Sequence, residues 1–199
     1  ICKNHPEIEF TFIYDRKAPE IDFGKNCRSV SIPPPARHPL LWYLWFERSL
    51  KRYLNRQEFD LFISPEGWIP AKLKCKSLAV IHDLNFFHFP EHLIRSHRNF
   101  LQKYFPKYAE RADRIATVSE YSKKDIERTL KIKEHKIDVV FNGVSSTFQA
   151  SNEKEFEAIK AQYSQGKDYF VFLGTIHPRK NLRNLLLAFD KFKETKRGE

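Results

Sequence analysis

The hydrophobic residues of this 199-residue chain fall into short apolar runs that alternate with longer stretches of helical periodicity. The short runs are rich in aromatic and β-branched residues and predict strands, whereas the longer stretches predict amphipathic helices. The predicted strands cover residues 9–16, 29–32, 59–64, 78–81, 115–118, 136–141 and 169–174. The predicted helices cover residues 39–54, 92–112, 121–130, 150–166 and 182–192. This alternation indicates an α/β fold with a parallel sheet and helices on both faces.

Polar residues follow several of the predicted strands at the position where each strand ends. They are Glu66, His82-Asp83, Ser119-Glu120 and Asn142-Gly143. Ligands bind at the carboxyl ends of the strands in such sheets. Ser119 lies just before the helix predicted over residues 121–130 and is a favoured residue type at a helix N-cap, so we expect a structural role for it. The pattern alone assigns no chemistry to this edge.

The composition changes after Asn142-Gly143, a pair that predicts a turn. The next segment is polar and charged, and a new apolar run begins near residue 169. We therefore expect one domain over residues 1–147 and the beginning of a second over residues 148–199. One strand and two helices cannot bury a core by themselves. Because the chain also contains no methionine, we expect it to be part of a longer polypeptide.

The charge of the chain narrows the choice of partners. Lys and Arg number 35 against 25 Asp and Glu, a net charge of +10, which suits polyanions, acidic membrane surfaces or phosphorylated small molecules. No nucleic-acid-binding motif accompanies the charge. The aromatic helix over residues 39–54 is expected to pack on a sheet, with a membrane-surface helix as the alternative. The three cysteines show no CxxC spacing, so we expect reduced thiols in a cytoplasmic protein.

The segment "VFLGTIHPRKNLRNLLLAF", residues 171–189, combines a strand, a turn and a helix with two cations between them. The apolar run stops at Gly174, and Arg179 and Lys180 lie just before the predicted helix, for which Asn181 is a plausible N-cap. A helix N-terminus already favours anions. Two cations beside it therefore suggest a phosphate site, and the alternative is a pair of solvated side chains on a loop.

Four segments, "VIHDLNFFHFPEHL", "ADRIATVSEYSKKDI", "KIDVVFNGVSSTF" and "FLGTIHPRKNLRNLLLAF", occur in an order and spacing that resembles the retaining GT-B glycosyltransferases of group 1, the GT4 type. The similarity runs from about residue 59 onward. It implies two Rossmann-like domains that face a cleft, with a nucleotide-sugar donor held mainly by the C-terminal one. It also implies metal-independent transfer with retention of the anomeric configuration.

The resemblance assigns roles to particular residues. Lys180 and Arg179 would bind the donor diphosphate beside the turn at Gly174, and Thr175 stands where the family usually has its arginine. His82 would hydrogen-bond the transferred sugar, the alternative being a histidine that only ends a strand. Asp83 would orient that imidazole or satisfy loop N–H groups. No metal is expected, because the spacing of the other histidines fits no metal-binding pattern; these are His88, His92 and His97.

Two features of the family are missing from the chain: the first strand with its glycine-rich acceptor loop, and the acidic motif of the donor domain. These residues alone are therefore expected to be inactive. The parent protein would be a hexosyltransferase of polysaccharide biosynthesis, with mannose as one candidate sugar. It would need no cofactor, use a nucleotide-diphosphate sugar as donor and a saccharide or lipid-linked acceptor, and contact the inner face of a membrane peripherally. The alternatives are a UDP-sugar epimerase and a basic module that binds nucleic acid or a partner protein.

Overall fold

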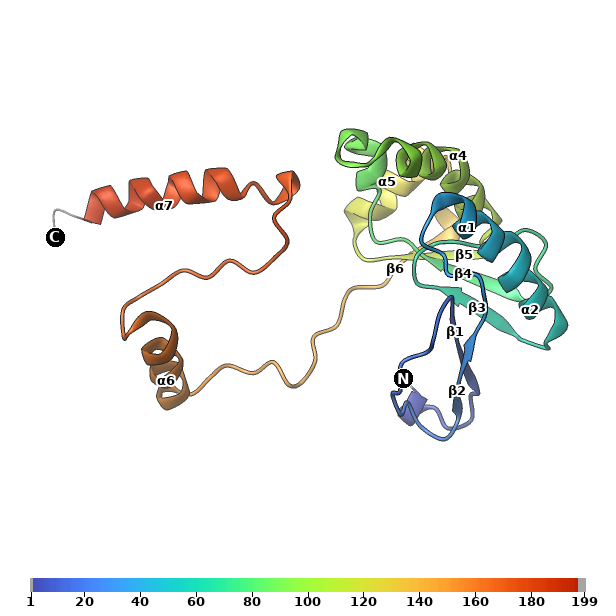
Figure 1. The fold of residues 1–199 in the computed structure, drawn as a ribbon, viewed down its shortest axis with the longest axis horizontal. Helices are drawn as coiled ribbons and strands as arrows, with labels where there is room; N and C mark the ends of the chain where they lie inside the picture. The colour runs from blue at the N-terminus through green and yellow to red at the C-terminus, as the bar shows by residue number, and fades with distance from the viewer. Residues whose placement is uncertain (1, 197–199) are drawn as a thin grey trace. The chain divides into compact units, whose positions relative to one another are not determined.

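A computed structural model describes residues 2–196 (Figure 1). The chain divides into two compact units, Ile1–Asn142 and Gly143–Glu199.

The first unit contains parallel strands in two sheets. Strands β3 (Leu61–Ser64), β4 (Lys76–Val80), β5 (Arg114–Thr117) and β6 (Ile137–Val139) form a four-stranded sheet in that order. Strands β1 (Phe10–Tyr14) and β2 (Cys27–Ser31) form a parallel pair of their own. The predicted α/β class with parallel strands is confirmed. The expected single sheet is in two parts, because β1 and β3 are both edge strands with no described strand between them.

The helices of the first unit follow the predicted amphipathic stretches. The aromatic stretch forms α1 (Pro39–Leu44), a π-helical segment (Trp45–Leu50) and α2 (Lys51–Arg56) in direct succession. It begins where His38 Nδ1 accepts a hydrogen bond from the Leu40 amide at 3.3 Å. The remaining helices are α3 (Asn85–His88), α4 (Arg95–Arg111) and α5 (Glu120–Leu130), with short 3₁₀ turns at Cys2–Asn4, Pro90–His92 and Glu134–Lys136. Pro106 lies inside α4 and does not end it.

The core of the first unit is built around Trp68, which lies on the segment that follows β3. Five aromatic rings have centroids 5.2–5.9 Å from its own, those of Trp42, Phe46, Phe100, Phe105 and Tyr108. The preceding Gly67 has a φ of +79° and no room for a side chain, since a Cβ would lie 3.1 Å from Phe105 Cζ. A glycine is therefore required where the chain turns from the strand into the core.

The amino end of β4 is fixed by a carboxylate. Asp113 Oδ2 accepts hydrogen bonds from the Ser77 amide at 2.9 Å and from Ser77 Oγ at 2.8 Å. The hydrogen bond from the Ser77 hydroxyl is the main reason that the pKa of Asp113 is below its usual value, and desolvation partly opposes it. This cluster closes the edge of the sheet opposite to the carboxyl ends of the strands.

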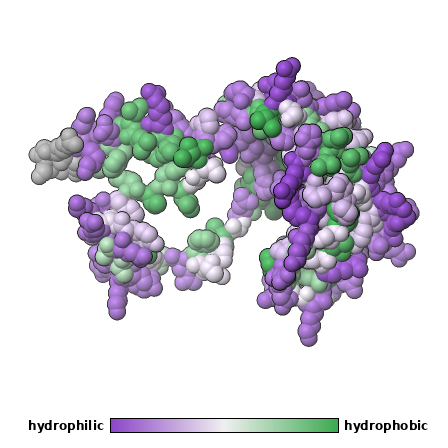
Figure 2. Space-filling view, viewed as in Figure 1, coloured by the Kyte–Doolittle hydropathy of each residue, from purple (hydrophilic) through white to green (hydrophobic). Residues whose placement is uncertain are grey.

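The second unit contains α6 (Glu153–Ser164), a 3₁₀ turn (Pro178–Lys180) and α7 (Leu182–Lys196). Asn152 and Glu155 form a reciprocal capping box at the start of α6. The strand predicted over residues 169–174 is wrong: the structure assigns neither helix nor strand there. A strand needs a hydrogen-bonded neighbour, and the described part of this unit contains no other strand. Apolar side chains of α7 are exposed along its length (Figure 2), with Leu186 60% exposed.

Candidate functional site

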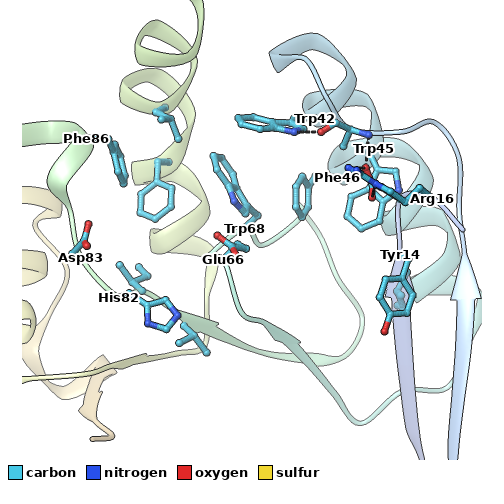
Figure 3. Close-up of a pocket in the computed structure, with 17 residues that line it drawn as sticks. Tyr14, Arg16, Trp42, Trp45, Phe46, Glu66, Trp68, His82, Asp83 and Phe86 are labelled. Carbon is cyan, nitrogen blue, oxygen red and sulfur yellow. Dashed lines mark hydrogen bonds and ion pairs between the residues drawn. The ribbon is translucent and has the colours of Figure 1, made fainter. Parts of the chain in front are cut away.

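A cavity of about 860 Å³ opens at the carboxyl ends of β1, β3 and β4 in the first unit (Figure 3). Its floor is apolar and comes from the aromatic helix, the segment after β3 and α4, through Trp42, Phe46, Trp68 and Phe105. Ile13 of β1 and Phe62 of β3 both pack against the buried side chains of that helix, Trp45, Leu50 and Leu54. The cavity therefore lies between two sheets that both pack against the aromatic helix.

The rim of the cavity is polar. His82 and Asp83 follow β4, Glu66 follows β3, and Asp15 and Arg16 follow β1. In Figure 3, Glu66 lies between the His82 ring and the aromatic floor, and the Asp83 carboxylate lies apart from that ring. The strand-end rule thus brings Glu66, His82 and Asp83 to one opening, as parallel strands require.

His82 and Asp83 are both exposed. Asp83 Oδ1 accepts a hydrogen bond from the Asn85 amide at 3.0 Å, at the start of α3. One of the two roles considered for this carboxylate, satisfying a loop N–H group, is therefore present in the structure. The arrangement leaves the His82 ring at the rim, where it can donate or accept a hydrogen bond with a bound molecule.

Asp15 and Arg16 are rim residues that the sequence reasoning missed. Arg16 donates from both Nε and Nη2 to the two carboxylate oxygens of Asp15, each at 2.9 Å. The Ala36 amide donates to the same carboxylate at 2.7 Å. Hydrogen bonding from the Arg16 guanidinium is the main reason that the pKa of Asp15 is lowered, while desolvation acts against it. The rim therefore carries a fixed, ionised carboxylate next to an accessible guanidinium. The signal was the "DR" pair at the end of the strand predicted over residues 9–16.

The candidate phosphate-binding residues lie in the second unit. Arg179 and Lys180 share the 3₁₀ turn that directly precedes α7, and both are exposed. His177 starts that turn, where its Nδ1 accepts from the Arg179 amide at 3.2 Å and its carbonyl accepts from the Lys180 amide at 2.8 Å. The Asn181 carbonyl accepts from the Leu185 amide at 3.2 Å, which begins α7. Gly174 and Thr175 lie outside helix and strand on the segment that leads to the turn.

The structure thus gathers the predicted residues into two groups. His82 and Asp83 lie at the cavity in the first unit, and Arg179 and Lys180 lie together on the 3₁₀ turn before α7 in the second. Within residues 2–196, no group of three or more His, Cys, Asp or Glu side chains is arranged to hold a metal ion. No helix in that range is both long and apolar enough to cross a membrane.

Comparison with known proteins connects this geometry to a family. The model of Glycosyltransferase Family 4 matches residues 7–148, which include the whole rim of the cavity. O-antigen chain mannosyltransferase B of Escherichia coli is 25% identical over 146 residues, 73% of this chain and 36% of that protein. O-antigen chain mannosyltransferase RfbU of Salmonella typhimurium strain LT2 is 29% identical over 155 residues, 74% of this chain and 38% of that protein. The aligned part of the chain therefore spans less than two fifths of either relative.

Proposed function

Because the chain belongs to glycosyltransferase family 4, we propose that it is part of an enzyme that transfers a hexosyl group from a nucleotide-diphosphate sugar to a saccharide or lipid-linked acceptor. Mannose is the first candidate for the sugar, since two relatives are mannosyltransferases of O-antigen chains. The observation that carries the proposal is the family match over residues 7–148, whose structure places His82 and a polar rim at one opening.

The proposed chemistry divides between the two units. In the first unit, His82 hydrogen-bonds the transferred sugar and stabilises charge as the glycosidic bond to the donor breaks. In the second unit, Arg179 and Lys180 neutralise the charge that grows on the departing diphosphate, assisted by the free N–H groups at the start of α7. These fixed cations and dipoles would perform the role that a metal ion has in other transferases, and we propose that transfer proceeds without a metal and with retention.

The two open sheet edges support the proposed domain organisation. Residues 1–147 would form the acceptor-side domain and residues 148–199 the beginning of the donor domain. Strands β1 and β3 are both edge strands, and apolar side chains beside both line the cavity between them. Unpaired edges beside an apolar floor are the expected setting for a further parallel strand that joins the two sheets. We propose that such a strand completes the acceptor-side domain and leaves the polar rim as the open part of the site.

Nucleotide binding tests the donor half of the proposal. Titration of the full-length protein with UDP, GDP and ADP by calorimetry is expected to show binding of one of them. The double variant Arg179→Ala/Lys180→Ala should bind that nucleotide at least about 10-fold more weakly, because each charge-assisted contact to phosphate contributes about 1.5–3 kcal/mol. The matched control is Lys191→Ala/Lys193→Ala, which removes two exposed cations from α7, the helix that follows the turn of Arg179 and Lys180.

Two results would contradict the donor site in different ways. If the wild-type protein binds none of the three nucleotides, the proposed activity is wrong. If it binds one and the double variant binds equally well, the activity survives and the phosphate site lies elsewhere.

We also propose that the outer face of α1 and α4 contacts anionic membranes. Leu40 is 61% exposed there, and the ring of Tyr43 lies 5.3 Å from that of Tyr104. The ammonium groups of Lys103 and Lys107 lie 5.2 and 5.8 Å from the centroid of the Tyr104 ring. An apolar residue beside aromatic rings and lysines is the composition that interfacial surfaces use.

Charge reversal on α4 tests this contact. Lys103→Glu/Lys107→Glu is expected to lower the affinity for phosphatidylglycerol vesicles, measured by co-sedimentation, at least about 10-fold. Each lysine near an anionic surface contributes about 1 kcal/mol to binding. Lys124→Glu/Arg128→Glu, an exposed pair with the same spacing on α5, serves as the control. Equal loss in both variants, or equal wild-type binding to neutral phosphatidylcholine vesicles, would contradict a specific docking face.

A further inference from the structure

The ladder between β4 and β5 ends just before the functional loop. The last register pair joins Val80 to Ala116, and the Ile81 amide donates to the Ala116 carbonyl at 2.9 Å. Beyond this point, side-chain hydroxyls take over from backbone amides. Thr117 Oγ1 donates to the Ile81 carbonyl at 2.7 Å, and Ser122 Oγ donates to the His82 carbonyl at 3.1 Å. Two consecutive carbonyls are thus held by hydroxyls, and both hydroxyl-bearing residues are buried.

The direction of the Ser122 hydroxyl is set by the cap of α5. Ser119 Oγ accepts a hydrogen bond from the Ser122 amide at 3.1 Å, which is the predicted N-cap interaction. The same hydroxyl donates to Ser122 Oγ at 3.0 Å. Because Ser122 Oγ accepts a hydrogen bond from Ser119, its own hydroxyl hydrogen is directed at the His82 carbonyl. The start of α5 therefore reaches across to the backbone of His82.

A second residue of α5 holds the other end of the same loop. Asp125 follows Ser122 by three positions, so the two side chains lie on neighbouring positions of one helix face. Its carboxylate oxygens lie 2.8 and 2.9 Å from His88 Nε2, at the end of α3. Thr129 Oγ1 donates to Asp125 Oδ1 at 3.0 Å and fixes the carboxylate in turn. Residues 82–88 are therefore attached to α5 at both ends.

We propose that Ser122 and Asp125 are positioning residues that set where the His82 ring stands at the cavity rim. The ring is exposed, so its position depends on its own backbone rather than on packing around the imidazole. Transfer requires the ring to meet the sugar within a few tenths of an ångström, and a shift of about 1 Å can lower a rate about 100-fold. The catalytic part of this inference rests on the proposed glycosyl transfer, whereas the positional part does not.

The experiment reads the position of the ring without any substrate. The full-length protein, labelled with ¹³C in its histidine rings, is compared with Ser122→Ala and Asp125→Ala, and the His82 signal is assigned by loss in His82→Gln. We expect the His82 signal to shift or split in both variants. Ser122→Thr, which keeps a hydroxyl, and Asp125→Asn, which keeps an acceptor, should restore most of it.

Ser77→Ala is the matched control for loss of stability. Ser77 is a buried serine at the opposite end of β4, and its hydroxyl bonds Asp113 rather than the His82 loop. It should lower the urea midpoint to a similar degree as Ser122→Ala and leave the His82 signal unchanged. If Ser77→Ala moves the His82 signal as much as Ser122→Ala does, or if neither α5 variant moves it, the positioning role is overturned.

Kinetics with GDP-mannose as the donor probe tests whether the position of the His82 ring affects catalysis. Ser122→Ala is expected to lower kcat about 10-fold with a much smaller change in KM, because the contact it disturbs forms fully only in the transition state. A displaced His82 signal with unchanged kcat would overturn the catalytic consequence. A displaced signal in a protein that does not turn over any nucleotide sugar would leave the positioning intact and contradict the proposed function.

Discussion

Replacing His82 with alanine is expected to lower kcat for glycosyl transfer about 100-fold while KM for the donor changes little. Loss of one preorganised hydrogen-bond donor at a developing charge typically lowers kcat about 10²–10³-fold. His82 lies at the rim of the cavity with its ring exposed and its backbone carbonyl held by Ser122. The substitution removes the ring and keeps the backbone hydrogen bond, so the loop should retain its position. Steady-state kinetics with the full-length protein measures both constants.

The matched control for this variant is His135→Ala. His135 is also exposed, but it lies in the turn that precedes β6. In a parallel sheet this is the amino edge, opposite to the cavity. Its removal should leave kcat unchanged. If His82→Ala keeps kcat within about threefold of the wild type, His82 makes no contact that strengthens in the transition state. The sugar is then not transferred at the rim beside β4.

The sequence predicted most of the secondary structure because its signals are local. The runs near residues 61, 78 and 115 became β3, β4 and β5, and Ser119 caps α5 as expected. The predicted strand near residue 170 failed for a physical reason. Residues 169–173 are rich in β-forming side chains, but a strand exists only with a hydrogen-bonded neighbour, and local pattern carries no information about that neighbour.

The residues of the candidate site were predictable only where they follow strands of one parallel sheet, whose carboxyl ends meet at one edge. Glu66 and His82 share a rim because β3 and β4 are parallel neighbours, and the parallel sheet predicted for the chain as a whole already placed strand ends at one edge. Asp15 and Arg16 were missed because β1 pairs with β2 in a separate sheet, and only packing against the aromatic helix brings its end to the cavity. The "DR" pair marks the end of the first strand, but it does not show that this end lies at the cavity.

The hydrogen bond that holds the His82 carbonyl was also not predictable from local sequence. Ser119 was recognisable as an N-cap because its position before the helix is a local property. The bond from Ser122 to the His82 carbonyl joins residues 40 positions apart. It depends on the register of β4 against β5 and on the point at which their ladder ends, which is set by the packing of the whole sheet.

Trp68→Ala is expected to have the largest effect on stability. Removing a fully packed large aromatic side chain lowers the free energy of unfolding by about 3–5 kcal/mol. A domain of this size has about 5–15 kcal/mol in total. Trp68 is 9% exposed and its ring centroid lies within 5.9 Å of those of five aromatic rings, so the substitution removes packing contacts with all of them. Urea denaturation followed by circular dichroism measures the loss without relying on tryptophan fluorescence.

Trp68 also links the aromatic core to the turn that carries Glu66. The Trp68 amide donates to Ser64 Oγ at 2.9 Å, which closes the turn that carries Glu66. The control is Phe89→Ala, which removes an aromatic ring that is 44% exposed and should cost less than about 1 kcal/mol. If Trp68→Ala is no more destabilising than this control, the aromatic cluster is not the core of the first unit. The turn at Glu66 and the strand end at His82 would then have to be held in place by the sheet alone.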